Sequence, residues 1–379
     1  MLEIYFDNAA TTRVDDTVLA QMNDVMKNEY GNPSSLHSRG VSAQLRMERA
    51  AHQVEAALGM KEGKLVFTSG GTEANNLAIL GTAEALRRRG DRIILTSIEH
   101  ASVLGCGKEL RRRGFDVVEL LCSSDGRISL EMLADALNDR TILVSMMLVN
   151  NEVGTIQPVR EAAKLVHARC PQARFHTDAV QAFGKIPFRV TELSVELLSL
   201  SGHKIHAPKG VGALYVAPGV RMQPLFYGGS QQEGVRPGTE SVPLIAALGT
   251  AAHEAQTDLQ ATAERLGALR KRLLAGLSEM DVVIHTPAED VSPFILNFSV
   301  PGFRSETVLH FLAQRNIFVS SGSACSKGAH SHVLAAMGCS DAEIDSALRL
   351  SFSKYSTPQE ADGFLESLRE AIHTLRRTN

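Results

Sequence analysis

A lysine and an aspartate follow two largely apolar runs in the middle of the chain. Lys204 ends Ser201-Gly-His-Lys204, directly after Val195–Leu200, and Asp178 ends His176-Thr-Asp178. A lysine kept out of water forms a Schiff base more readily, because desolvation lowers the pKa of its ammonium group. A carboxylate can keep a pyridine nitrogen protonated. Together they predict pyridoxal phosphate (PLP), a cofactor that withdraws electrons from its substrate. Either residue alone would be ordinary, as a solvated lysine or a helix-capping aspartate.

Other polar residues supply contacts that such a cofactor needs. The turn 68–73, Thr-Ser-Gly-Gly-Thr-Glu, joins a predicted strand to a predicted helix. There Gly71 and Thr72 would leave backbone amides for a phosphate, although a strand–glycine–helix turn is often only a turn. His100 follows another apolar run and would stack on the cofactor ring or carry a proton; the simpler interpretation is a structural histidine. Gln181 would donate to the phenolic oxygen of the cofactor.

A cysteine in a loop of small residues suggests chemistry beyond the transfer of an amine. The segment Ser320-Ser-Gly-Ser-Ala-Cys325-Ser-Lys-Gly places a thiol beside Lys327, which favours the nucleophilic thiolate. The simpler alternative is a linker with an incidental thiol.

Arg349 has apolar neighbours, and a buried arginine usually pairs with a carboxylate, which can be that of a substrate.

Length and composition predict two domains and exclude several classes of protein. The chain has 379 residues, of which 44% are hydrophobic and 21% charged, as in soluble globular proteins. The net charge of -3 argues against direct nucleic-acid binding. The basic clusters Arg87–Arg89 and Arg111–Arg113 are interpreted as helix ends rather than as a docking patch for an acidic or RNA partner.

The sequence also predicts a cytoplasmic protein with reduced thiols. Its first residues lack a signal-peptide pattern, and no apolar run is long enough to span a membrane, so no membrane partner is expected. The five cysteines are scattered without zinc-ligand spacing. We therefore expect no metal and no structural disulfide, with four of the cysteines acting as packing residues.

The arrangement of strands and helices predicts how these residues come together. Predicted strands (64–68, 92–97, 116–121, 141–149, 174–177, 197–201 and 212–216) alternate with predicted helices (one after Ser42, then 73–88, 101–112, 130–136 and 159–168). This alternation is typical of an α/β domain with a mostly parallel sheet, which binds ligands outside the carboxyl ends of its strands. The Gly/Pro-rich connection 227–243 leads into a second, smaller α+β region.

Taken together, these residues resemble the NifS/IscS type of cysteine desulfurase, PLP-dependent enzymes of fold type I in the class-V aminotransferase group. The resemblance covers nearly the whole chain and rests on Tyr5-Phe-Asp-Asn-Ala-Ala-Thr-Thr12, Gly31-Asn-Pro-Ser-Ser35, Thr68–Glu73, Val149-Asn-Asn-Glu-Val-Gly154, Ser201–Lys204, Arg236-Pro-Gly-Thr-Glu240 and Ser320–Cys325. It implies a large PLP-binding α/β domain, residues 13–257, with a mostly parallel seven-stranded sheet. Residues 1–12 and 258–379 would form a smaller α+β domain carrying the catalytic cysteine loop.

The resemblance also implies a role for each candidate residue. Lys204 binds the cofactor covalently, His100 stacks on its ring, and Asp178 pairs with the ring nitrogen. Gln181 and Asn151 contact the edge of the cofactor or substrate, Arg349 takes the substrate carboxylate, and Cys325 accepts the sulfur. The phosphate is held by Gly71, Thr72, Ser201, His203 and Thr239, the last reaching it from the partner subunit of a homodimer.

The implied reaction converts L-cysteine to L-alanine and keeps the sulfur as a persulfide on Cys325. The sulfur then passes to an acceptor protein, such as an iron–sulfur scaffold or an enzyme of tRNA or cofactor thiolation. The segment after Cys325 is shorter than in the iron–sulfur-assembly members, which leaves the acceptor open. A selenocysteine lyase or a class-V aminotransferase is the alternative activity. A catalytically idle binding protein is disfavoured, because it would not need Lys204, Asp178, His100 and Cys325 together.

Overall fold

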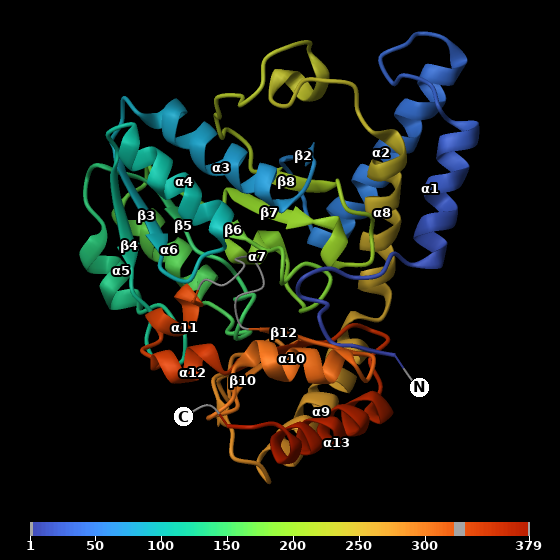
Figure 1. The fold of residues 1–379 in the computed structure, drawn as a ribbon. Coiled ribbons are helices and arrows are strands. Elements are labelled where there is room, and N and C mark those ends of the chain that lie inside the picture. The colour runs from blue at the N-terminus through green and yellow to red at the C-terminus, as the bar shows by residue number, and fades with distance from the viewer. Residues whose placement is uncertain (1–2, 322–329, 378–379) are drawn as a thin grey trace.

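The largest element of the computed structural model, which describes residues 3–321 and 330–377, is a seven-stranded sheet (Figure 1). Its strand order is β2-β8-β7-β6-β5-β3-β4. All neighbouring strands are parallel except β8, which runs antiparallel to β2 and β7. The predicted, mostly parallel α/β sheet is therefore confirmed. The strands are β2 (Lys64–Thr68), β3 (Arg92–Thr96), β4 (Asp116–Leu120), β5 (Thr141–Ser145), β6 (Arg174–Asp178), β7 (Leu197–Ser201) and β8 (Gly212–Val216).

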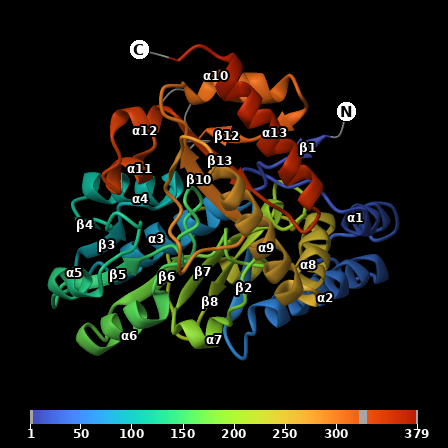
Figure 2. The ribbon, with the colours of Figure 1, turned by 90° about the horizontal axis from the view of Figure 1, so that it is seen from below.

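Helices cover both faces of this sheet (Figure 2). They are α1 (Asp16–Asn28), α2 (Ser38–Leu58), α3 (Gly71–Leu86), α4 (Ala101–Arg112), α5 (Leu130–Ala136), α6 (Val159–Arg169), α7 (Val190–Leu193) and α8 (Val242–Thr257). Successive side chains of a strand point to opposite faces of the sheet, so one strand contributes side chains to the cores on both faces. In β3, Ile93 and Leu95 pack with buried residues of α3 and α4, whereas Ile94 joins the core shared with α5 and α6.

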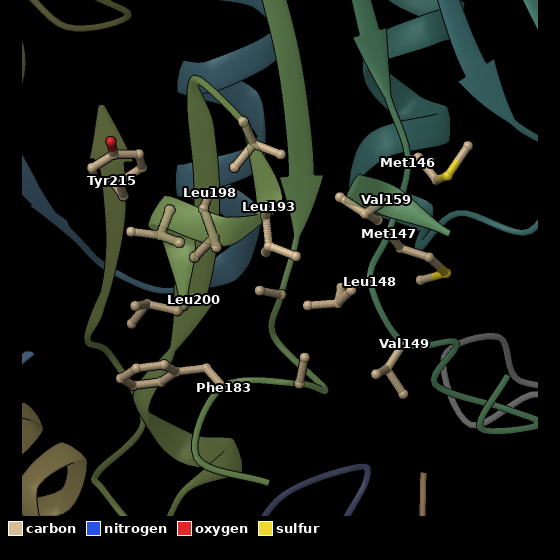
Figure 3. Packing of buried hydrophobic residues seen from close by; sticks show 14 of the residues in the cluster. Met146, Met147, Leu148, Val149, Val159, Phe183, Leu193, Leu198, Leu200 and Tyr215 are labelled. Carbon is tan, nitrogen blue, oxygen red and sulfur yellow. The ribbon is translucent and has the colours of Figure 1, made fainter. Parts of the chain in front are cut away.

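The predicted strand 141–149 is wrong at its end, because β5 stops at Ser145. Residues 146–149 continue as irregular chain beside β6, where the backbone amide of Met146 donates to the carbonyl of His176. They stay apolar because they remain buried, with Met146, Leu148 and Val149 in the same core as Leu198 and Leu200 of β7 (Figure 3). An apolar run indicates that the residues are buried. Irregular chain can be buried as well as a strand, so the apolar pattern did not show where β5 ends.

A second, four-stranded sheet of order β12-β13-β10-β9 is antiparallel throughout. Its strands are β9 (Val283–Ile284), β10 (Ile295–Ser299), β12 (Ser320–Ser321) and β13 (Ala347–Ser351), and nearby lie α9 (Leu259–Leu277), α10 (Ser305–Ala313), α11 (His332–Ala336), α12 (Asp341–Asp345) and α13 (Pro358–Thr374). A short parallel pair joins β1 (Ile4–Tyr5) to β11 (Ile317–Phe318). The N-terminal strand thus lies beside C-terminal chain.

Separate apolar cores support the predicted division into two domains. Ile4 and Phe6 cluster with buried residues of α9, β10, β13 and α13, apart from the cores of the large sheet. The helices α8 and α9 are separated only at Asp258, where the helical hydrogen bonding is interrupted. The boundaries 13–257, 1–12 and 258–379 stay a prediction.

Further observations in the described part of the chain concern the cysteines, one basic cluster, and the helices and side-chain clusters searched for membrane and metal sites. Cys106, Cys122, Cys170 and Cys339 are free thiols there. Arg111 and Arg112 lie in the last turn of α4 and pair with Glu119 and Glu109, as expected of a helix end. Within residues 3–321 and 330–377, no helix is both long and apolar enough to cross a membrane, and no cluster of three or more His, Cys, Asp or Glu side chains is arranged to hold a metal ion.

Candidate active site

A cavity of about 310 Å³ lies where the central strands of the large sheet end. It brings together nearly all of the predicted site residues: Gly71, Thr72, His100, Asn151, Asp178, Gln181, Ser201, His203, Lys204 and Arg349. Asp178 ends β6 and Ser201 ends β7, so the parallel strands place these side chains at one edge of the sheet. Among the described residues, Thr239 is the predicted one that does not line it; it is exposed in the connection before α8. Cys325 lies outside the described residues.

Lys204 is held at one side of this cavity by backbone carbonyls. It ends the 3-10 turn Gly202–Lys204, which follows β7 directly. Its Nζ donates to the carbonyl of Ala9 at 2.6 Å and to that of Ala10 at 2.7 Å. These carbonyls come from the N-terminal segment, which sequence patterns did not connect with Lys204. The amine is therefore fixed at the cavity wall.

A chain of hydrogen bonds links Asp178 to His100. Asn75 Nδ2 donates to Asp178 Oδ2 at 2.7 Å and to Ser102 Oγ at 2.9 Å. Ser102 Oγ lies 2.8 Å from His100 Nδ1, and the backbone amide of Ser102 donates to the same nitrogen. Because Nδ1 accepts, the network assigns the proton of the neutral imidazole to Nε2. Asn75 and Ser102 were missed by sequence reasoning.

The end of the site around Gly71 and His203 suits an anion. A neighbouring cavity of about 460 Å³ shares Gly71, Thr72, Ser201 and His203 with the first and adds Lys209. The 16-residue helix α3 begins at Gly71, so its first amides and its positive dipole end lie there. A Cβ on Gly71 would lie 2.8 Å from Val180 Cγ2, so this close approach needs glycine. Burial, followed by the charge of Lys204, lowers the pKa of His203 to about 4.

Arg349 is buried in β13, with 2% of its surface exposed. Its Nη2 donates to Asp7 Oδ1 at 2.9 Å and its Nη1 to the carbonyl of Asn151 at 3.0 Å. The expected carboxylate partner thus exists within the protein, contributed by Asp7. Arg349 Nε has no hydrogen-bond partner among the described residues, so one donor of the guanidinium is still available.

The comparison with known proteins decides the family once this geometry is known. The sequence pattern described as Aminotransferase class-V matches residues 4–364. The chain belongs to the class-V aminotransferase family. Members of this family use PLP, so the cofactor predicted from Lys204 and Asp178 is confirmed.

Relatives in the class-V aminotransferase family match over nearly the whole chain. The cysteine desulfurase IscS of Methanosarcina thermophila is 40% identical, covering 98% of this chain and 93% of the relative. A solved NifS-like protein is 40% identical with a TM-score of 0.94, covering 99% of this chain and 100% of that one. The solved structure of SspA in complex with cysteine is 34% identical with a TM-score of 0.81, covering 93% and 100%.

The cavity fits the cofactor of class-V aminotransferases in its charges and its available polar atoms. Asp178 Oδ1 accepts from the amide of Val180, and within residues 3–321 and 330–377 no cation forms an ion pair with this carboxylate. It is therefore placed to meet a protonated ring nitrogen. Asn75 Oδ1 is buried without a partner in the described chain, so the cavity wall has unused hydrogen-bonding capacity.

Glu99, next to His100, is a buried acid that sequence reasoning left unassigned. Its Oε1 accepts from Thr96 Oγ1 and from the amide of Met147, both at 2.8 Å. Its Oε2 has no partner among the described residues. Burial, reinforced by the charge of Asp178, raises the pKa of Glu99 to about 8. This carboxyl group is therefore protonated at neutral pH.

Glu99→Gln is expected to weaken a pH dependence of stability. In the unfolded chain Glu99 titrates near pH 4.5, but in the folded protein near pH 8. The folded state thus binds more protons between these values, and the stability present below pH 4.5 is lost as the pH rises through 8. Glutamine keeps the Oε1 acceptor without titrating. In urea unfolding at alkaline pH, the variant should be more stable than wild type by roughly 1–3 kcal/mol.

The matched control is Glu366→Gln, which changes an exposed glutamate of α13. It should follow the wild-type dependence of unfolding free energy on pH. If Glu99→Gln kept that dependence unchanged between mildly acidic and alkaline pH, the burial argument for Glu99 would be wrong.

Proposed function

We propose that this chain is a cytoplasmic, PLP-dependent cysteine desulfurase that converts L-cysteine to L-alanine and passes the sulfur to an acceptor protein. The observation that carries the proposal is the convergence of Lys204, Asp178, His100 and Arg349 on one cavity. The 40% identity to a cysteine desulfurase over 98% of the chain supports it. The bound cysteine of the SspA structure supports the substrate.

Each residue around the cavity has a distinct task in this proposal. Asp178 holds the ring nitrogen of the cofactor, and Gly71, Thr72, Ser201 and His203 hold its phosphate. Arg349, which lines the cavity, binds the substrate carboxylate, while Asn151 lies beside it. When bound, PLP accepts electrons from the substrate Cα and so makes its proton removable. The Nζ of Lys204 is the base that takes this proton.

The cysteine loop completes the reaction. The Cys325 thiolate attacks the substrate sulfur, so a new S–S bond forms as the C–S bond breaks. The electron pair of the broken bond stays with Cβ, which gains a proton, and Lys204 returns a proton to Cα before L-alanine leaves. His100 carries that proton on Nε2, in keeping with its assigned tautomer. The loop starts beside the substrate arginine, because Ser320 of β12 is paired with Arg349.

A homodimer is part of this proposal, with Thr239 reaching the partner's phosphate site. The connection that carries Thr239 is anchored to the edge strand β2 and to the first turn of α3. Gln232 exchanges hydrogen bonds with the backbone of Phe67 in β2, and Arg236 pairs with Glu73 of α3 at 2.9 Å. Tyr227, the first residue of this connection, is 85% exposed, as expected of an aromatic residue that lies in a subunit interface. The acceptor would be an iron–sulfur scaffold or a thiolation enzyme.

Product analysis tests this function directly. Purified protein incubated with L-cysteine and a thiol reductant should form L-alanine and sulfide in equal amounts. Formation of alanine only from L-selenocysteine would point instead to a selenocysteine lyase. Conversion of cysteine to its oxo acid, dependent on an added oxo acid that takes the amine, would indicate an aminotransferase.

A further inference from the structure

A second lysine lies next to the cavity, and the reaction above does not use it. Lys185 is 4% exposed, and its Nζ donates to Gln181 Oε1 at 2.7 Å. The Nζ also lies 6.0 Å from the ring centre of Phe294. In the part of the chain that the structure describes, no carboxylate forms an ion pair with Lys185. A lysine buried this far is rare without a specific contact to offset its desolvation.

The contact with Lys185 fixes which edge of the Gln181 amide faces the site. A carboxamide has an accepting oxygen and a donating NH2 group, which exchange places when the amide turns over. Because Oε1 accepts from Lys185, the NH2 group points the other way and donates to the carbonyl of Ala9 at 2.9 Å. The same carbonyl accepts from Lys204 Nζ at 2.6 Å. The donating edge of Gln181 therefore lies beside the amine that binds the cofactor.

Lys185 keeps this role whether or not it carries a charge. Burial, followed by the charges of Lys204 and Arg349, lowers the pKa of Lys185 well below its ordinary value. Both the ammonium and the neutral amine can donate to Oε1, and the ammonium form, which cannot accept, excludes the NH2 group of Gln181 as its partner. The reverse orientation of Gln181 would bring its oxygen toward Ala9's carbonyl oxygen, and two acceptors repel.

Lys185 also borders a larger cavity of about 620 Å³, where a bound anion would be another reason for a buried lysine. Other cations around that cavity already have partners. Lys354 pairs with Asp15, and Arg265 donates to the carbonyls of Ser356 and Lys354. The contact with Gln181 therefore explains the burial of Lys185 better than a bound anion does.

We propose that Lys185 is a positioning residue that locks the Gln181 amide with its NH2 group toward Lys204, where it donates to the phenolic oxygen of the cofactor. The inference rests on the proposed placement of PLP at Lys204. A donor at that oxygen stabilises its anionic form. Loss of Lys185 would remove one of the two contacts that fix the amide and leave only the one to the carbonyl of Ala9, so the reversed orientation, which presents an oxygen and disfavours the anion, would become more populated.

The test is a pH titration of the visible absorption of the bound cofactor. In Lys185→Met, which keeps the length of the side chain without its donor, the midpoint should move up by about one pH unit. Gln181→Glu, which has no NH2 group, should shift it in the same direction and covers the case in which Lys185→Met fails to fold. Lys164→Met, at an exposed position of α6, should leave the midpoint unchanged.

A double variant separates the proposed mechanism from a direct charge effect. If Lys185 acts through the amide, Lys185→Met should add little further shift in a Gln181→Ala background. An undiminished shift of the midpoint in the Gln181→Ala background would overturn the proposal and favour a charge effect or an anion in the larger cavity. The absence of a shift in both the wild-type and the Gln181→Ala background would also overturn it. A protein that shows the cofactor absorption but forms no alanine from cysteine would contradict the proposed function alone.

Discussion

Replacing Lys204 by alanine is expected to lower the rate of L-alanine formation from L-cysteine by about 10³-fold or more. The amine is fixed at the cavity wall by the carbonyls of Ala9 and Ala10, and we propose that it is both the covalent anchor and the base. Alanine provides neither function, and the backbone carbonyls cannot replace them. Single-turnover and steady-state assays measure the loss. The visible absorption that depends on covalent attachment should vanish in the same variant.

The control for this variant is Lys164→Ala, which removes an exposed lysine of α6 and should keep full activity. Circular dichroism of both variants would establish that the folds are equal. Retention of many turnovers by Lys204→Ala would contradict the assignment of this lysine, whatever its effect on the spectrum.

Replacing Cys325 by serine is expected to separate cofactor binding from sulfur transfer. The contacts to PLP are proposed for Lys204, Asp178 and the phosphate-binding residues rather than for Cys325, so the visible absorption and the affinity for PLP should stay at wild-type levels. A hydroxyl is a far weaker nucleophile than a thiolate at neutral pH, so transfer of sulfur to an acceptor should fall by about 10²-fold or more. Transfer is measured with radiolabelled cysteine and a thiol-bearing acceptor protein.

Cys339→Ser is the matched control for the thiol. Cys339 is half-buried after α11, and burial raises the pKa of its thiol, so it is a poor nucleophile. This variant should transfer sulfur at the normal rate. A Cys325→Ser protein that did the same would remove the central step of the proposed reaction.

The sequence was sufficient to predict the site residues that lie at the ends of strands. Asp178 and Ser201 follow apolar runs, and parallel strands bring such positions to one edge whatever the details of packing. Residues inside helices carry no such marker. Asn75 and Asn76 are adjacent in α3, yet only Asn75 is buried and bonded to Asp178, whereas Asn76 bonds the carbonyl of Thr72. Their difference arises from tertiary packing.

Long-range partners were also beyond sequence patterns. Asp7 reaches Arg349 because the N-terminal segment pairs with the second sheet, where Asp7 bridges to Ser351. Nothing near either residue signals this contact. Lys185 resembles a surface lysine in a Gly-Lys turn, and only its burial beside Gln181 distinguishes it.

The most direct test of the account is intact-mass analysis after brief exposure to L-cysteine, with L-alanine quantified in the same sample. The proposed reaction should leave one added sulfur atom, located on Cys325 by peptide mapping, together with an equal amount of alanine. Alanine without sulfur on Cys325, or neither product despite bound PLP, would contradict it.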